Sequence, residues 1–315
     1  MHREELLRMF PERMRDRWQE TADLCGQLQE IRLRSGLPVT IYTEEGERFI
    51  DGRGRVVDRQ DAAVRSTPKE LEDILQHLCQ YSLYAFADEI RQGFLTIQGG
   101  HRVGLAGQVI LEEAGRIRNM KYIRYLNIRI AHQIKGAADS VIAYLYENGQ
   151  VCNTLLISPP GCGKTTMLRD LIRQLSDGTV YGQGVNVSVV DERSEIAGSY
   201  MGIPQNDVGT RTDILDGCPK AEGMMMLIRS MSPQVLAVDE LGSDQDMEAL
   251  RLASGCGCKL MATIHGSSLE EIKSKEYMRY VIAERLFDRF VVLGRQSGNF
   301  VIEGIYDREG KRCIS

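Results

Sequence analysis

Apolar and polar residues alternate differently in the two halves of the chain. In the first half, helical periodicity predicts two short helices before residue 28, a helix that begins at Thr67 and a further helix near residues 82–91. Short alternating segments that predict strands occupy residues 30–34, 39–43, 48–50, 93–111 and 125–130. We therefore expect residues 1–148 to form a smaller α+β domain.

From residue 149 onward, unbroken apolar runs alternate with helical segments. The runs that predict buried strands are residues 151–157, 185–190, 235–238, 259–264 and 290–293. Such strands, separated by helices, favour a mainly parallel sheet that is covered on both faces. The fold class is thus α/β, with a second domain over residues 149–315 and a linking helix expected at residues 138–146. Ligands of such sheets bind beyond the carboxyl ends of the strands.

Composition narrows the protein class. The chain has 315 residues, 43% hydrophobic and 26% charged, with a formal charge of −5. This length favours two domains, each with its own hydrophobic core. The net negative charge argues against a protein that binds nucleic acid over its whole surface. No apolar run reaches the roughly 18 residues of a membrane span, and the charged N-terminus does not resemble a signal peptide. We expect a cytoplasmic location.

The segment after the run at 151–157 has the pattern of a phosphate-binding loop. It comprises Ser158, Pro159, Pro160, Gly161, Cys162, Gly163, Lys164, Thr165 and Thr166. Glycines let backbone N–H groups converge on a phosphate, Lys164 would reach the β- and γ-phosphates, and Thr165 would offer its hydroxyl to Mg²⁺. Ser158 stands where the usual pattern has its first glycine, a position that only opens the turn. The pattern predicts a nucleotide, ATP, with Mg²⁺.

Acidic residues follow two further strands. Asp239 and Glu240 end the run at 235–238, and we expect Asp239 to hold Mg²⁺ through water and Glu240 to polarise the attacking water. Glu192 and Glu195 follow the run at 185–190 and could position that water from the opposite side. His265 ends the run at 259–264 at the same edge, which favours a γ-phosphate sensor over a structural histidine.

Basic residues gather late in the first domain. Between Gly115 and Gly136 the chain has six cations and no acid, and Arg102 lies upstream. One interpretation is a solvated strand face. The other is that, in an assembled ring, these arginines complete the phosphate site of the next subunit. The sequence leaves both open.

The four sites, in their order along the chain, resemble those of the ATPases of type II and type IV secretion. Residues 189–198 and 238–242 more closely resemble the stage III sporulation protein AA family, and residues 102–107 and 127–131 extend the likeness into the first domain. The resemblance implies a RecA-like P-loop NTPase domain that binds ATP and Mg²⁺. It also implies a hexameric ring on the mother-cell side of the forespore envelope, with a membrane protein of a sporulation channel as its partner.

The resemblance also assigns roles and leaves one open. Secretion ATPases usually lack an acid at the position of Asp239, so the catalytic base stays undecided between Glu240 and the acids Glu192 and Glu195. Arg102, Arg124 and Arg129 would act in trans. Related plant and cyanobacterial ATPases carry a nucleic-acid-binding tail, which we do not expect here. Two alternatives remain: a nucleic-acid motor that uses the arginines of residues 116–135, and a nucleotide-gated assembly factor with negligible turnover.

Overall fold

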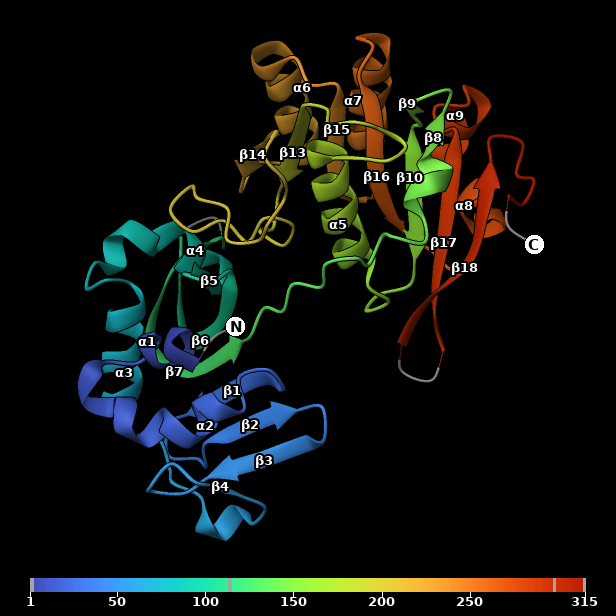
Figure 1. The fold of residues 1–315 in the computed structure, drawn as a ribbon. Coiled ribbons are helices and arrows are strands. Elements are labelled where there is room, and N and C mark those ends of the chain that lie inside the picture. The colour runs from blue at the N-terminus through green and yellow to red at the C-terminus, as the bar shows by residue number, and fades with distance from the viewer. Residues whose placement is uncertain (1–2, 113–114, 297–298, 314–315) are drawn as a thin grey trace. The chain divides into compact units, whose positions relative to one another are not determined.

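The computed structural model describes residues 3–112, 115–296 and 299–313 (Figure 1). The chain divides into two compact units, Met1–His132 and Gln133–Ser315. The division therefore lies before residue 133 and not at residue 149, where the sequence had placed it. Each unit has its own sheet and its own core, so each is described by itself.

The first unit is built on an antiparallel sheet with the strand order β4-β3-β2-β1-β7-β6-β5. Its strands are β1 (Leu28–Arg34), β2 (Thr40–Thr43), β3 (Gly46–Ile50), β4 (Val56–Val57), β5 (Phe94–Ile97), β6 (His101–Leu111) and β7 (Ile117–Arg129). Its helices are α1 (Arg3–Arg8), α2 (Gln19–Asp23), α3 (Pro68–Leu78) and α4 (Ala87–Gln92), with 3₁₀ turns at Glu12–Trp18, Gln60–Ala62 and Leu83–Phe86.

Local sequence explains the best-defined helix of this unit. At the start of α3, the Thr67 hydroxyl accepts the N–H of Glu70, and the Glu70 carboxylate accepts the N–H of Thr67. This reciprocal cap satisfies two N–H groups that the helix itself cannot pair. Leu71 and Ile74 then pack inward. Helices α3 and α4 lie against β7, which buries one face of the sheet.

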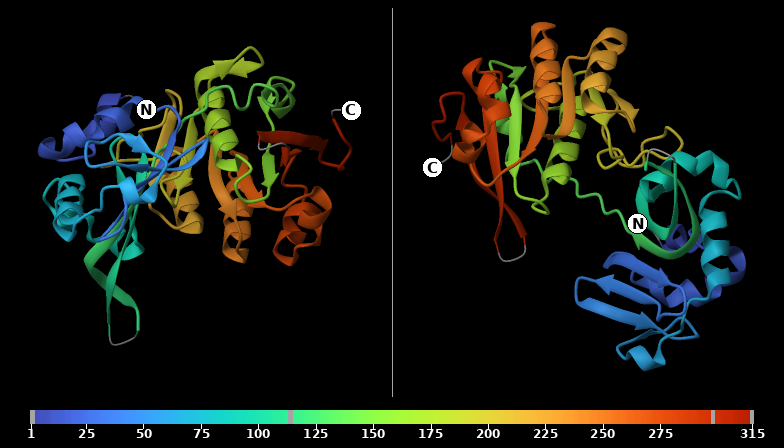
Figure 2. Two further views of the ribbon diagram at one scale, coloured as in Figure 1. Left: turned by 90° about the horizontal axis from the view of Figure 1, so that it is seen from below. Right: turned by 180° about the vertical axis from the view of Figure 1, so that it is seen from behind.

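Strands β6 and β7 are much longer than their neighbours. Strand β1 pairs with β7 from Tyr125 to Arg129, and β5 pairs with β6 from His101 to Gly104. Farther out, β6 and β7 continue as a two-stranded ribbon, pairing from Gln108 with Lys121 to Leu111 with Ile117. Figure 2, left, shows this ribbon extending beyond the other strands of its unit. The sequence predicted strands at 93–111 and 125–130 but not this extension of β7.

The second unit is built on a sheet with the order β14-β13-β15-β16-β10-β17-β18, parallel except for β18. Its strands are β10 (Thr154–Ser158), β13 (Val187–Asp191), β14 (Thr212–Asp216), β15 (Val235–Leu241), β16 (Lys259–His265), β17 (Arg289–Gln296) and β18 (Asn299–Asp307). Two small hairpins pair β8 (Tyr146–Glu147) with β9 (Gln150–Val151), and β11 (Gly178–Thr179) with β12 (Gly182–Gln183). The helices are α5 (Lys164–Asp177), α6 (Lys220–Met231), α7 (Asp244–Gly255), α8 (Leu269–Ser274) and α9 (Arg279–Ala283), with 3₁₀ turns at Ile142–Leu145 and Glu276–Met278.

Apolar cores lie on both faces of this sheet. Leu155 and Ile157 of β10 belong to the core beneath α6 and α7, whereas Leu156 belongs to the core beneath α5. Successive residues of a strand point to opposite faces, so a strand that is buried on both sides reads as an unbroken apolar run. The mainly parallel, doubly covered α/β sheet that the sequence predicted is confirmed.

The segment expected to be a linking helix is part of this second core. Residues 136–141 form turns, and a single 3₁₀ turn follows at Ile142–Leu145. Val141, Ile142 and Leu145 are buried in the core beneath α5, and the Ala138 N–H donates to the Asp170 carboxylate (2.9 Å). The apolar residues that looked like one face of a helix are instead anchors to α5, which moves the boundary between the units upstream.

Candidate active site

The loop after β10 is shaped to bind an anion. Gly161 and Gly163 have φ of +74° and +78°, values that side-chain-bearing residues rarely adopt. A Cβ at Gly163 would also lie 3.2 Å from the ring of Phe300. Gly163 caps α5, whose first residue is Lys164, so the unpaired N–H groups of the first turn open onto the loop. The loop therefore has the backbone geometry that a phosphate group requires.

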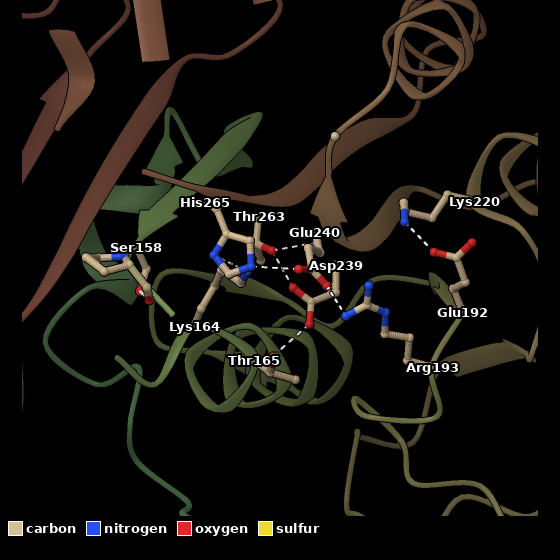
Figure 3. Close-up of polar contacts among 12 residues, drawn as sticks. Ser158, Lys164, Thr165, Glu192, Arg193, Lys220, Asp239, Glu240, Thr263 and His265 are labelled. Atoms are coloured by element: carbon tan, nitrogen blue, oxygen red, sulfur yellow. Dashed lines mark hydrogen bonds and ion pairs between the residues drawn. The ribbon is translucent and has the colours of Figure 1, made fainter. Parts of the chain in front are cut away.

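Strand order brings the other candidate residues to this loop. Strand β16 lies between β10 and β15, and β13 flanks β15 on the far side. Ser158 at the end of β10 is in register with His265 at the end of β16. Because these strands are parallel, their carboxyl ends meet at one edge of the sheet, as Figure 3 shows.

Two hydroxyl groups hold Asp239. Thr165 Oγ1 donates to Asp239 Oδ2 at 2.7 Å, and the Thr263 hydroxyl donates to Asp239 Oδ1 (Figure 3). The Thr263 oxygen in turn accepts the backbone N–H of Glu240 at 2.8 Å. A carboxylate and a hydroxyl in contact beside a phosphate loop form a set of hard oxygen donors that suits Mg²⁺. The structure thus brings together the two residues that the sequence assigned to the metal.

Lys164 lies against His265. Its Nζ is 3.4 Å from each ring nitrogen of His265, and the lysine is only 8% exposed. Burial lowers the pKa of Lys164 below its ordinary value, although the negative charges of Asp239, Glu240 and Glu195 oppose the shift. Among the residues that the structure describes, no carboxylate forms an ion pair with this amine. A bound phosphate would supply the counter-charge.

Glu240 is oriented by its backbone conformation and by contacts with His265 and Arg193. The pairing of β15 with β16 shifts register between Val238 and Leu241, and Glu240 has a left-handed φ of 58°. A bulge of this kind redirects a side chain next to a site. Glu240 Oε1 is 2.6 Å from His265 Nε2, and Oε2 is 2.8 Å from Arg193 Nη1. Both carboxylate oxygens are therefore engaged.

These partners determine the charge state of Glu240. Burial raises the pKa of Glu240, but the hydrogen bond from His265 and the charges of Arg193 and Lys164 outweigh it. The pKa of Glu240 lies below its ordinary value as a result. The carboxylate is accordingly ionised at neutral pH, the state in which it can accept a proton from water.

Asp191 organises the loop after β13. It is 2% exposed and accepts the backbone N–H groups of Glu195 (2.8 Å), Ile196 (3.0 Å) and Ala197 (2.8 Å). Burial raises its pKa, against the effect of those hydrogen bonds. Arg169 of α5 fixes the same loop through the Ile196 carbonyl (2.6 Å). Arg193 lies on this loop and pairs with Glu240 of β15.

The two other candidate acids lie in one small cleft. Glu192 and Glu195 line it together with Asp239 and Glu240. The Glu192 carboxylate forms an ion pair with Lys220 at the start of α6 (Figure 3). The sequence predicted neither the Glu192–Lys220 pair nor the Arg193–Glu240 pair. Each pair joins elements that become neighbours only in the folded sheet.

The candidate arginines all lie in the first unit. Arg102 and Arg129 are directly opposite each other on β6 and β7. The Arg102 guanidinium lies 3.7 Å from the centre of the Phe94 ring, and Arg129 Nε is 3.8 Å from a Glu30 oxygen. Arg124 Nη1 donates to the carbonyl of the adjacent Ile123 at 3.2 Å. Arg102 and Arg129 thus form a pair of neighbouring cations on one sheet face.

Sequence comparison decides the family. A model of the family described as "Sporulation stage III, protein AA" matches residues 1–313. The chain belongs to this family. It is 41% identical over 307 residues to the stage III sporulation protein AA of Bacillus subtilis (strain 168), covering 97% of this chain and 95% of that protein. It is also 30% identical over 180 residues to the uncharacterized protein ycf45 of Porphyra purpurea, covering 56% of this chain and 30% of that protein.

Solved structures agree with the fold of this family member. The Legionella pneumophila ATPase DotB is similar with a TM-score of 0.59 at 16% identity, over 95% of this chain and 82% of DotB. The pilus retraction motor PilT with bound ADP is similar with a TM-score of 0.55 at 14% identity, over 88% of this chain and 78% of PilT. The predicted fold, a RecA-like P-loop NTPase domain preceded by a smaller α+β domain, is confirmed. The chain thus has the fold of an ATPase and of a pilus retraction motor.

Proposed function

We propose that this protein is an ATPase that hydrolyses ATP with Mg²⁺. The observation that supports this most is the contact between Thr165 and Asp239 at 2.7 Å, beside Lys164 and at the edge where Glu240 and His265 meet. In P-loop ATPases a hydroxyl and an acid at these positions hold the metal, and the lysine neutralises phosphate. Bound Mg²⁺ supplies charge neutralisation on the phosphate oxygens.

Each remaining residue of the site has a proposed role. The loop from Ser158 to Thr166 surrounds the phosphates with backbone N–H groups. Glu240 accepts the proton of the attacking water, and His265 reports the state of the γ-phosphate to it through the 2.6 Å contact. Glu192 and Glu195, which line the same cleft as Glu240, position the water.

The assembly is also part of the proposal. Membership of a sporulation family with the fold of secretion ATPases supports a homo-oligomer, a hexameric ring, that powers or assembles a sporulation channel from the mother-cell cytoplasm. A membrane protein of that channel would be its partner. In the described part of the chain, no helix combines the length and the apolar character that a membrane span needs. Arg102, Arg124 and Arg129 would complete the site of the neighbouring subunit.

Steady-state phosphate release tests the enzyme directly. The full chain with Mg²⁺ and ATP should release phosphate at a rate per subunit that rises with protein concentration, because sites completed in trans form only on assembly. Binding of ATP without release would identify a nucleotide-gated assembly factor instead. Strongly salt-dependent stimulation by nucleic acid would favour a nucleic-acid motor.

Substitution of the acids identifies the base. Glu240→Gln should lower the turnover about 10²- to 10⁴-fold, the usual effect of losing a general base. Glu192→Gln should lower it less, because the Glu192 carboxylate pairs with Lys220, whereas Glu240 contacts His265, which lies against Lys164. The measurement is the single-turnover rate at saturating ATP, with Glu248→Gln on the surface of α7 as the matched control. A larger effect at Glu192 would reverse the assignment.

A further inference from the structure

The outer part of the β6–β7 ribbon combines exposed apolar and cationic side chains. We call residues 108–112 and 115–122 the distal ribbon. Val109, Leu111, Ile117 and Tyr122 are 41%, 60%, 45% and 62% exposed. Their backbone positions are joined across the ribbon, since Leu111 pairs with Ile117 and Val109 with Met120. Exposure of large apolar side chains to water is unfavourable, and these side chains lie close together at paired positions. Such a cluster indicates a surface that contacts another molecule.

Cations surround these apolar residues. The sequence from residue 108 to residue 122 has three cations, Arg116, Arg118 and Lys121, against two acids, Glu112 and Glu113. Glu112 lies 3.7 Å from Arg116. Lys121 Nζ is also 5.3 Å from the centre of the exposed Tyr122 ring. The segment therefore has a small positive excess, whereas the chain as a whole has a formal charge of −5. Its charge complements an anionic surface.

We propose that the distal ribbon binds the surface of an anionic lipid membrane. Aliphatic side chains inserted at the boundary between headgroups and acyl chains lose their contact with water, and a tyrosine favours the same depth. Arginine and lysine beside them attract anionic headgroups. Nucleic acid accounts for the cations but not for Leu111 and Ile117, because phosphate is contacted by cationic and polar groups.

The geometry suits such a contact. Across the distal ribbon β6 and β7 pair with each other, whereas the pairs with β1 and β5 begin only at Tyr125 and Gly104. The ribbon therefore presents its side chains without cover from the other described strands of its sheet (Figure 2). The phosphate loop and the acids of the proposed ATPase site lie in the other unit, and the arginines proposed to act in trans are not part of the distal ribbon, so this binding does not depend on ATP hydrolysis.

Co-sedimentation of the full chain with vesicles tests the proposal. The chain should bind vesicles of phosphatidylglycerol and phosphatidylcholine, and should bind phosphatidylcholine alone much more weakly. The double variant Leu111→Asp with Ile117→Asp should bind about tenfold or more weakly, since it removes apolar contact and adds negative charge. The matched control is Leu37→Asp with Val180→Asp, two exposed apolar residues outside the ribbon, and it should bind as the parent does.

Three results would overturn the proposal. Equal vesicle binding by the ribbon variant and the parent would exclude the ribbon as the contact. Loss of duplex DNA binding in that variant, with no vesicle binding by the parent, would make the ribbon a nucleic-acid arm. A smaller oligomeric mass of the variant, again without vesicle binding, would make it a contact between subunits. Circular dichroism of both double variants checks that the fold is intact.

Discussion

Replacing Lys164 with alanine should reduce ATP hydrolysis about 10²- to 10³-fold, the effect expected from losing a fixed charge at a developing anion. Lys164 Nζ points to the edge of the sheet where His265 and Glu240 meet, and only 8% of the residue is exposed. A charge in so buried a place acts through a low local dielectric, which strengthens its effect on phosphate. The measurement is steady-state phosphate release at saturating ATP and Mg²⁺.

The fold should survive this substitution. Burial lowers the pKa of Lys164 despite the attraction of nearby carboxylates, so the folded protein disfavours the charged amine, and we expect its removal to destabilise the fold little. The thermal midpoint of Lys164→Ala should therefore match that of the parent. Lys273→Ala on α8, an exposed lysine of the same unit, is the control and should retain full activity. Undiminished hydrolysis by Lys164→Ala would end the proposal of a P-loop ATPase.

Loss of the arginines at the first unit's sheet should be at least as severe. A variant with Arg102→Ala and Arg129→Ala removes two cations that face each other across β6 and β7. An arginine finger that acts on the neighbouring site contributes about 10³ to 10⁵ in rate, so hydrolysis should fall by that order. Arg59→Ala, an exposed arginine of the same unit paired with Asp61, is the control and should leave the rate unchanged.

Mixing separates action in trans from a structural role. Subunits with Lys164→Ala keep their arginines, and the arginine-deficient subunits keep their phosphate loop. A mixed assembly therefore contains interfaces in which an intact loop meets an intact arginine pair, and some activity should return. Activity that stays at the level of the two separate variants would argue that the arginines act within their own chain or only support the fold.

The sequence predicted most of the second unit because its strands are apolar on both faces. Such strands read as unbroken runs, and the loop after β10 has turn chemistry of its own. It missed β14 because an edge strand with acids at Asp213 and Asp216 has no apolar run. The sequence placed the boundary between the units too late because Val141 and Leu145 are spaced as on a helix. In the structure these residues insert into the core of the second unit from turns and a single 3₁₀ turn.

Site residues were predictable where a strand end carries a distinctive residue, as at Asp239, Glu240 and His265. Partnerships between them were not. The Arg193–Glu240 pair depends on β13 lying beside β15 in the sheet, and the Glu192–Lys220 pair depends on the position of α6. Neighbouring strands of a parallel sheet are separated in sequence by whole helices, so the local sequence pattern cannot predict contacts between their side chains.

The double engagement of Glu240 has a consequence for its basicity. Each carboxylate oxygen keeps a second lone pair, so water can approach Glu240 while both partners stay, but the charge of Arg193 lowers the pKa of the carboxylate and makes it a weaker base. His265 belongs to a buried strand, whereas Arg193 is 59% exposed and lies on the loop that follows β13. The arginine is therefore the more easily displaced partner, and if Glu240 is the proposed base, movement of the loop that carries Arg193 would strengthen that base.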